Sequence, residues 1–248
     1  MFCVNVLRFL GRLVTTLSMR RAFDFYQSRF YLTLFSLSLG LAMFAFGPAE
    51  ALQFDAARIQ QTAKARYGQR SAQAVSRWMT MMSQHRSSPE SQQLRAVNDF
   101  WNTTVLGAED IDIWKKNDYW ATPLETLGKL AADCEDFVIG KYFSLVHMGV
   151  PPEKLRLIYV RARIGGMGSS TSIAHMVLGY YATPDADPLV LDNLMGSIAP
   201  ASQRRDLTPV FSFNAQGVYV AGAANSSPDR IGHWRNLLSK MQKEGFQP

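Results

Sequence analysis

Residues 133–149 read DCEDFVIGKYFSLVHMG, and this stretch decides the fold. Its apolar side chains recur at three- and four-residue steps, which predicts a helix over 133–148 with Val138 and Tyr142 on one face. Gly149 is a typical residue after a helix end, so we expect the helix to stop there. The predicted helix therefore begins at a cysteine that acidic residues surround.

The chain before this stretch is expected to be helical. Apolar residues at helical spacing predict one long helix over 55–85 and a second over 90–101. The stretch 102–122 is irregular, aromatic and acidic, and Pro123 can open a short helix over 124–130.

After residue 150 the apolar residues change from helical spacing to alternation. We expect strands over 155–163, 173–182 and 189–192, a hairpin that joins 210–213 to 218–221, and a last helix over 231–243. Helices followed by a mostly antiparallel sheet predict an α+β fold, with the cysteine-bearing helix packed on the sheet.

Residues 1–51 have the pattern of a targeting segment. Five arginines precede an uncharged apolar run over 30–46, and small residues at 49 and 51 stand where signal peptidase needs them. We therefore predict a removable signal peptide, with a mature domain over 52–248 outside the cytoplasm. The alternative is a retained membrane anchor, although the apolar run is at the short edge for crossing a bilayer.

The composition suits a packed globular protein. The 248 residues are 47% hydrophobic and 19% charged, with a formal net charge of +6. No run of basic residues in the body of the chain, over 52–248, interleaves with aromatic ones, so we expect no nucleic-acid partner.

Cys134 is the only cysteine left once 1–51 is removed, because the other one in the chain is Cys3. Exported proteins normally use cysteines in pairs, so a lone thiol suggests a chemical task. A buried, inert cysteine is the alternative, and the cysteine count alone does not decide between the two.

The order of Cys134, His175 and Asp192 fits a catalytic triad. Cys134 lies in the first turn of its predicted helix, where the helix dipole favours a thiolate. His175 falls on the second predicted strand and Asp192 at the end of the third, as a base and a residue that orients it. A core histidine and a turn aspartate are the alternatives. The Cys134 backbone N–H is a candidate oxyanion donor.

Three carboxylates flank the thiol, at Asp133, Glu135 and Asp136. They should raise the thiol pKa and oppose the thiolate, and a bound cation would offset this effect. Carboxylate oxygens without clustered histidines or cysteines suit Ca²⁺ better than zinc. We expect Asp133 and Glu135 to bind calcium, with Asp118 as a further candidate ligand. The alternative is that acidic residues simply favour a helix start.

The sequence also resembles a known family, the bacterial transglutaminase-like cysteine proteinases, and within it the LapG-type periplasmic adhesin proteases. The resemblance covers nearly all of 52–248. The motifs that carry it are 118–125 (DYWATPLE), 133–137 (DCEDF), 141–143 (KYF), 155–160 (LRLIYV), 174–177 (AHMV) and 191–193 (LDN).

The resemblance implies a papain- or transglutaminase-like fold with Cys134, His175 and Asp192 as the triad, and calcium dependence through the acids beside the cysteine. It implies a periplasmic endopeptidase that cleaves a large surface adhesin near its N-terminus, at a di-alanine site, and so controls adhesion and biofilm release. It also implies control by an inner-membrane cyclic-di-GMP receptor that sequesters the protease.

Two other functions stay open from the sequence. The same triad can transfer an acyl group to an amine, as a transglutaminase or amidase does, because the acyl-enzyme is common to both reactions. The chain can also be a non-catalytic exported binding module, although all three triad positions hold competent residues. Thiol alkylation separates the binding module from the two enzymes, since an inert structural cysteine reacts slowly and a catalytic one fast.

Overall fold

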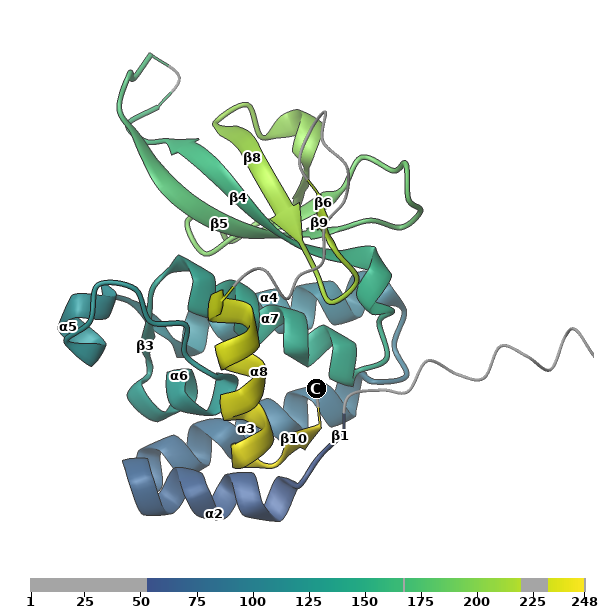
Figure 1. Cartoon of the computed structure of the whole chain (residues 1–248). Helices are drawn as coiled ribbons and strands as arrows, with labels where there is room; N and C mark the ends of the chain where they lie inside the picture. Colours follow the sequence, from purple (N-terminus) through teal and green to yellow (C-terminus); the bar gives the residue numbers. More distant parts are fainter. Residues whose placement is uncertain (1–52, 167, 220–231, 248) are drawn as a thin grey trace, which may run out of the picture. The chain divides into compact units, whose positions relative to one another are not determined.

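The computed structural model describes residues 53–166, 168–219 and 232–247 (Figure 1). The predicted signal peptide over 1–51 lies outside these residues, so it stays a prediction. Within the described ranges, none of the helices is long and apolar enough to cross a bilayer.

Helices make up the first part of the domain. They are α2 (Ala56–Tyr67), α3 (Gln69–His85) and α4 (Glu90–Thr104). The prediction of one helix over 55–85 is wrong at Gly68, whose φ of 83° lies in the left-handed region that glycine adopts without strain. The N–H of Gly68 donates to the Lys64 carbonyl at 3.0 Å and closes α2.

The stretch 102–122, expected to be irregular, contains two short elements, β2 (Leu106–Gly107) and α5 (Asp110–Trp114). Next come α6 (Pro123–Lys129), which starts at the expected proline, and β3 (Ala131–Ala132). The strands β2 and β3 pair in parallel, so they join two segments more than twenty residues apart.

The predicted helix over 133–148 is confirmed as α7 (Cys134–His147). It is locked to α3 and α4 because the indole N–H groups of Trp78 and Trp101 donate to the buried Ser144 hydroxyl, at 2.8 and 3.0 Å. A Cβ at Gly140 would lie 2.6 Å from the Trp101 ring, so this close packing requires a glycine. The middle and the C-terminal half of α7 are therefore fixed against α3 and α4.

Within the described residues, the chain after α7 forms a six-stranded sheet above the helices (Figure 1). Its order is β7-β6-β5-β4-β8-β9, and every neighbouring pair is antiparallel. The strands are β4 (Leu155–Arg163), β5 (Ser172–Tyr180), β6 (Leu189–Leu191), β7 (Ala199–Pro200), β8 (Leu207–Phe213) and β9 (Val218–Tyr219). Short 3-10 turns cover Pro152–Lys154 and Ala201–Gln203.

The last helix, α8 (Gly232–Glu244), returns along the helical part, and β10 (Phe246–Gln247) pairs with β1 (Gln53–Phe54). Leu157 and Met176 of the sheet belong to the same buried cluster as Phe137 and Leu145 of α7. The expected α+β fold, with the cysteine helix packed on an antiparallel sheet, is confirmed.

Candidate active site

Cys134 is the first residue of α7, separated from β3 by Asp133 alone, and its thiol is half-buried. The Sγ donates to Glu135 Oε2 at 3.1 Å. Burial, followed by the charges of Glu135 and Asp133, raises the thiol pKa above its ordinary value, and a backbone hydrogen bond from Met176 acts in the opposite direction. The helix start therefore supplies a nucleophile that its own neighbours hold protonated.

His175 and Asp192 form a buried pair. His175 Nε2 lies 2.7 Å from Asp192 Oδ1, and both side chains are almost completely enclosed. The antiparallel register pairs Leu191 of β6 with Leu178 of β5. Asp192, the next residue, therefore lies beside the part of β5 that carries His175. His175 and Asp192, which the sequence predicted as base and orienting residue, are thus in direct contact.

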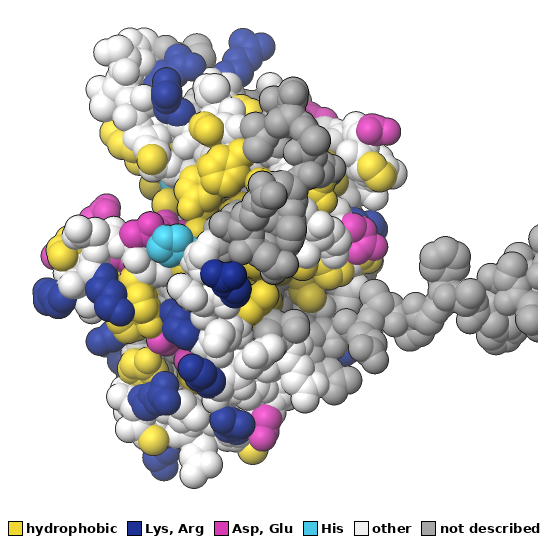
Figure 2. Space-filling model, viewed as in Figure 1, with side chains coloured by type: hydrophobic (Ala, Val, Ile, Leu, Met, Phe, Trp, Pro, Cys, Tyr) yellow, Lys and Arg dark blue, Asp and Glu magenta, His cyan; other side chains and the backbone are white. Residues whose placement is uncertain are grey.

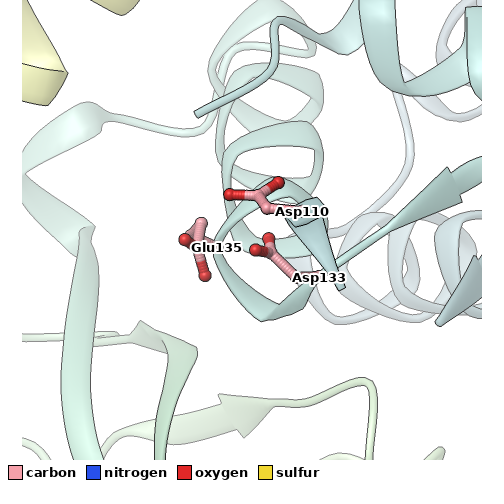
Figure 3. A group of neighbouring side chains, drawn as sticks. All are labelled: Asp110, Asp133 and Glu135. Atoms are coloured by element: carbon pink, nitrogen blue, oxygen red, sulfur yellow. The ribbon is translucent and has the colours of Figure 1, made fainter. Parts of the chain in front are cut away.

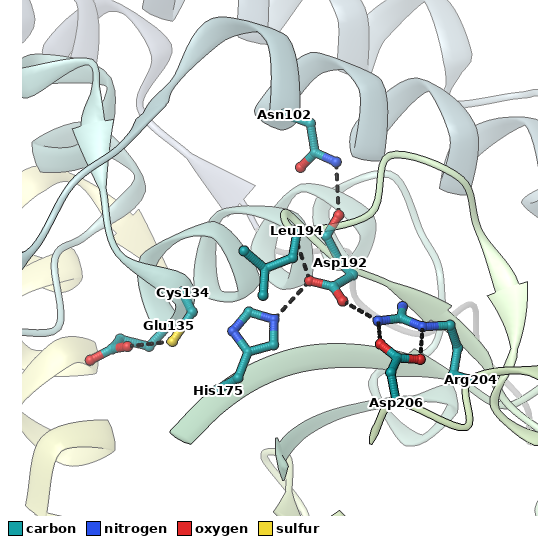
Figure 4. A network of polar contacts seen from close by, with 8 residues as sticks. All are labelled: Asn102, Cys134, Glu135, His175, Asp192, Leu194, Arg204 and Asp206. Carbon is teal, nitrogen blue, oxygen red and sulfur yellow. Dashed lines mark hydrogen bonds and ion pairs between the residues drawn. The ribbon is translucent and has the colours of Figure 1, made fainter. Parts of the chain in front are cut away.

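Figure 4 shows the thiol and the imidazole pointing toward each other. Since Nε2 of His175 is bonded to Asp192, Nδ1 is the nitrogen left to face Cys134. The structure therefore brings together all three predicted triad residues, in the order nucleophile, base and orienting carboxylate.

Every oxygen of Asp192 has a partner. Its Oδ1 also accepts from the Leu194 N–H at 3.0 Å, its Oδ2 accepts from Arg204 Nη2 at 2.7 Å, and its carbonyl accepts from Asn102 Nδ2 at 2.8 Å. Burial opposes ionisation of Asp192, but the hydrogen bond and charge of His175, then Arg204 and the Leu194 N–H, outweigh it and lower its pKa to about 2. Arg204 was not selected from the sequence, because its inner partner Asp192 lies twelve positions away across a turn.

An acidic group lies beside Cys134, where carboxylate oxygens of Asp110, Asp133 and Glu135 come within 4.8 Å of one another (Figure 3). The parallel β2–β3 pair explains the grouping, since it matches Gly107 with Ala132. Asp110 lies three residues after one strand and Asp133 directly after the other.

This group suits a hard cation. Burial, then the charges of Asp136, Glu135 and Asp110, raises the pKa of Asp133 to about 10. The pKa values of Glu135 and Asp110 are raised too, with burial as the main cause. Among the described residues, Oδ1 of both Asp110 and Asp133 is buried without a hydrogen-bond partner. Buried carboxylates that crowd one another and lack donors are those that a calcium ion would satisfy.

The expectation for Asp118 needs correction. Its carboxylate lies 3.5 Å from His233 Nε2 and is more than half exposed. Asp110, rather than Asp118, completes the group with Asp133 and Glu135. Asp136 is fully buried, and its Oδ1 accepts from the Ala121 N–H at 2.7 Å, so it anchors the loop before α6 to the start of α7.

An apolar surface adjoins the thiol. On the face in Figure 2, hydrophobic side chains gather over the part of the sheet next to the helices, with acidic side chains beside them. Tyr159 and Phe211, both half-buried, stack with ring centroids 4.5 Å apart. Burial, then the charges of Glu135 and Asp118 and of Cys134, raises the pKa of Tyr159, so this ring lies near the candidate nucleophile.

A model of the family described as bacterial transglutaminase-like cysteine proteinase (BTLCP) matches residues 58–205. The chain belongs to this family. The proteinase is therefore a hydrolase that uses a cysteine, as the resemblance in the sequence implied. The match begins in α2 and ends just after Arg204, so it spans Cys134, His175, Asp192 and Arg204.

Solved structures of Legionella pneumophila LapG resemble this proteinase. The EGTA-treated form is 35% identical with a TM-score of 0.67, and the match covers 77% of this chain and all of that one. The calcium-bound form is 36% identical with a TM-score of 0.64, and the match covers 75% of this chain and 99% of that one. The comparison with curated proteins found no match.

Proposed function

We propose that this proteinase is a calcium-dependent endopeptidase with Cys134 as nucleophile, His175 as base and Asp192 as the residue that orients the base. The observation that carries the proposal is the 2.7 Å contact between His175 and Asp192, with the other imidazole nitrogen toward the thiol. A buried carboxylate that fixes one ring nitrogen leaves the other free to move a proton.

Acylation begins when His175 Nδ1 takes the proton of Cys134 and the sulfur attacks the carbonyl carbon of the peptide bond. The resulting oxyanion is placed to accept a hydrogen bond from the Cys134 backbone N–H, which has no partner within the helix because Cys134 is its first residue. The C–N bond then breaks as the imidazolium returns its proton to the leaving amine. A thioester remains on Cys134.

Water completes the reaction. His175 takes a proton from a water molecule as its oxygen attacks the thioester carbonyl, and the C–S bond then breaks as the imidazolium gives that proton to the leaving sulfur. The products are a free carboxylate and the regenerated thiol. The stacked rings of Tyr159 and Phe211 offer an apolar surface beside the thiol, on which an extended peptide can lie.

We propose that Asp110, Asp133 and Glu135 hold the calcium ion. When bound, calcium supplies positive charge that offsets the carboxylates opposing the Cys134 thiolate. The calcium-bound and EGTA-treated forms of the similar Legionella protein support this choice of metal.

The substrate and setting extend the same proposal. The family resemblance of the motifs supports a large surface adhesin cleaved at a di-alanine site near its N-terminus, which releases the cell from a biofilm. It also supports a periplasmic location and control by the periplasmic domain of an inner-membrane cyclic-di-GMP receptor. The targeting pattern of residues 1–51 supports export.

Cleavage of a fluorogenic peptide with a central Ala-Ala bond tests the activity. We expect the exported protein to cleave the peptide and Cys134→Ala to be inactive, with an unchanged fold by circular dichroism. Full activity in Cys134→Ala would refute the proposal. Mass spectrometry with an added primary amine separates the other reactions: an amide product instead of a carboxylate shows acyl transfer. Slow alkylation of Cys134 together with no product shows a binding module.

A further inference from the structure

The carboxylate of Asp192 is held from two sides. On one side Oδ1 contacts His175, and on the other Oδ2 contacts Arg204 Nη2, both at 2.7 Å (Figure 4). The side chains of all three residues are at most 3% exposed. A carboxylate clamped through both oxygens cannot rotate without breaking an enclosed, charge-assisted hydrogen bond.

Arg204 is itself fixed from behind. Its Nη2 also lies 2.7 Å from Asp206 Oδ2, and its Nε lies 3.0 Å from Asp206 Oδ1. Asp206 is about one-third exposed, so the outer end of the arrangement faces water. One guanidinium edge thus bridges an outer carboxylate to the inner one, as the planar shape of arginine allows.

The backbone around Arg204 is tied to the sheet. The Leu207 N–H donates to the Arg204 carbonyl at 3.1 Å, which closes a turn between the short helix Ala201–Gln203 and β8. The Arg163 N–H of β4 donates to the Asp206 carbonyl at 2.8 Å. The guanidinium therefore projects from a rigid support.

We propose that Arg204 is a positioning residue for catalysis: it holds the Asp192 carboxylate in the orientation that fixes the His175 imidazole, and Asp206 holds Arg204. This inference rests on the triad proposed above. Arg204 acts through Asp192 and touches no reacting atom.

Four charged groups act on Asp192 from the elements around it. They are His175 of β5, Arg204 and Asp206 of the turn before β8, and Lys141 of α7. Arg204 is the one that bonds directly to the oxygen that His175 leaves free. Removing Arg204 should therefore change the orientation and acidity of Asp192 more than removing Asp206 or Lys141 would.

The histidine resonances of the exported protein test the inference without any substrate. In the wild type we expect a downfield Nε2–H proton on His175, because the bond to Asp192 fixes the tautomer. In Arg204→Met, a side chain of similar length without charge, we expect this signal to broaden or disappear. Arg204→Lys restores the charge but not the two-sided contact, so we expect an intermediate spectrum.

Arg205→Met is the matched control, because Arg205 is the next residue and its side chain is exposed. It should leave the His175 spectrum unchanged. Where Arg204→Met folds poorly, Arg204→Lys and Asp206→Asn carry the test, since both keep groups of similar size. In the peptide assay, we expect kcat per folded molecule to fall about tenfold or more in Arg204→Met, with little change in KM.

The outcomes separate the two proposals. An unchanged His175 signal and an unchanged kcat per folded molecule in Arg204→Met would overturn the positioning role, even if Cys134→Ala is inactive. A lower melting temperature alone would show that Arg204 is merely structural. If cleavage persists in Cys134→Ala, the triad itself fails, whatever the Arg204 variants show.

Discussion

Cys134 Sγ donates a hydrogen bond to Glu135 Oε2 at 3.1 Å, so the candidate nucleophile is bonded to a carboxylate of its own helix turn. This contact favours the thiol over the thiolate, because ionisation would place two negative charges side by side. Glu135 also belongs to the acidic group with Asp110 and Asp133. A cation that draws Glu135 toward that group would release the thiol.

Chelation should therefore lower both activity and stability. Removing calcium leaves the acidic group uncompensated, and a ligand that binds only the folded state stabilises it. At free calcium about 100 times Kd we expect the melting temperature to rise by about 5–10 °C over the chelated protein. Thermal melts and peptide cleavage, with chelator and after calcium is restored, measure this. Magnesium should restore both poorly, because it demands a tighter octahedral site. Identical curves in all conditions would exclude the calcium site.

A pair of variants distinguishes the two candidate ligands outside the cysteine motif. Asp110→Asn should abolish the calcium-induced rise in melting temperature, because Asp110 lies in the acidic group. Asp118→Asn should keep it, since Asp118 lies against His233 instead. Isothermal titration of calcium into both variants measures the affinities. A loss of binding in Asp118→Asn alone would restore the sequence-based expectation.

The loss of His175 and the loss of Asp192 should affect activity and stability differently. His175→Ala removes the base, and we expect a loss of about 10²–10⁴-fold in kcat with a modest change in stability. Asp192→Ala should reduce kcat no more than this, yet it also strands the buried Arg204, so we expect the unfolding free energy to fall by roughly 1–3 kcal/mol. Single-turnover cleavage and urea denaturation measure the two quantities. An active His175→Ala protein would mean that another residue is the base.

Much of the site could be predicted, because its helix and strands follow from the spacing of apolar residues within short segments. The helix at Cys134 follows from residues 133–149 alone, and alternation predicted the strand Leu155–Arg163 at its observed bounds. The sheet then brings His175 to Asp192, because β5 and β6 are consecutive in the sequence and pair antiparallel, side by side. Gly68 was missed because the helical spacing of apolar residues continues across it.

Asp110 and Arg204 were missed for a different reason. Asp110 reaches the acidic group through β2 and β3, and strands of two residues leave no periodic pattern. Arg204 has its inner partner twelve positions away, across a turn, and nothing in its own neighbours marks it as buried. Both contacts depend on how separate segments of the chain pack together. The spacing of residues in a single sequence does not predict this packing.

Lys141 lies two turns after Cys134 in α7, fully buried, and its Nζ has no hydrogen-bond partner among the described residues. Burial lowers its pKa from 10.5 to about 7, although the charges of Asp192 and Asp99 oppose the shift. Between pH 7 and 10.5 the unfolded chain binds the proton that the folded chain has lost. Lys141 therefore destabilises the fold fully below pH 7, and this effect fades as the pH rises to 10.5.

Lys141→Met should remove this penalty. We expect the variant to gain unfolding free energy over the wild type below pH 7, with an upper bound of about 5 kcal/mol from the pKa shift, and the gain should vanish near pH 10.5. Urea denaturation of both proteins from pH 5 to 10 measures the difference, in which the titration of the shared carboxylates cancels. Lys64→Met, an exposed lysine of α2, is the control and should show no such trend. A constant difference across this range would show that Lys141 stays protonated in the folded protein, stabilised by Asp192 and Asp99.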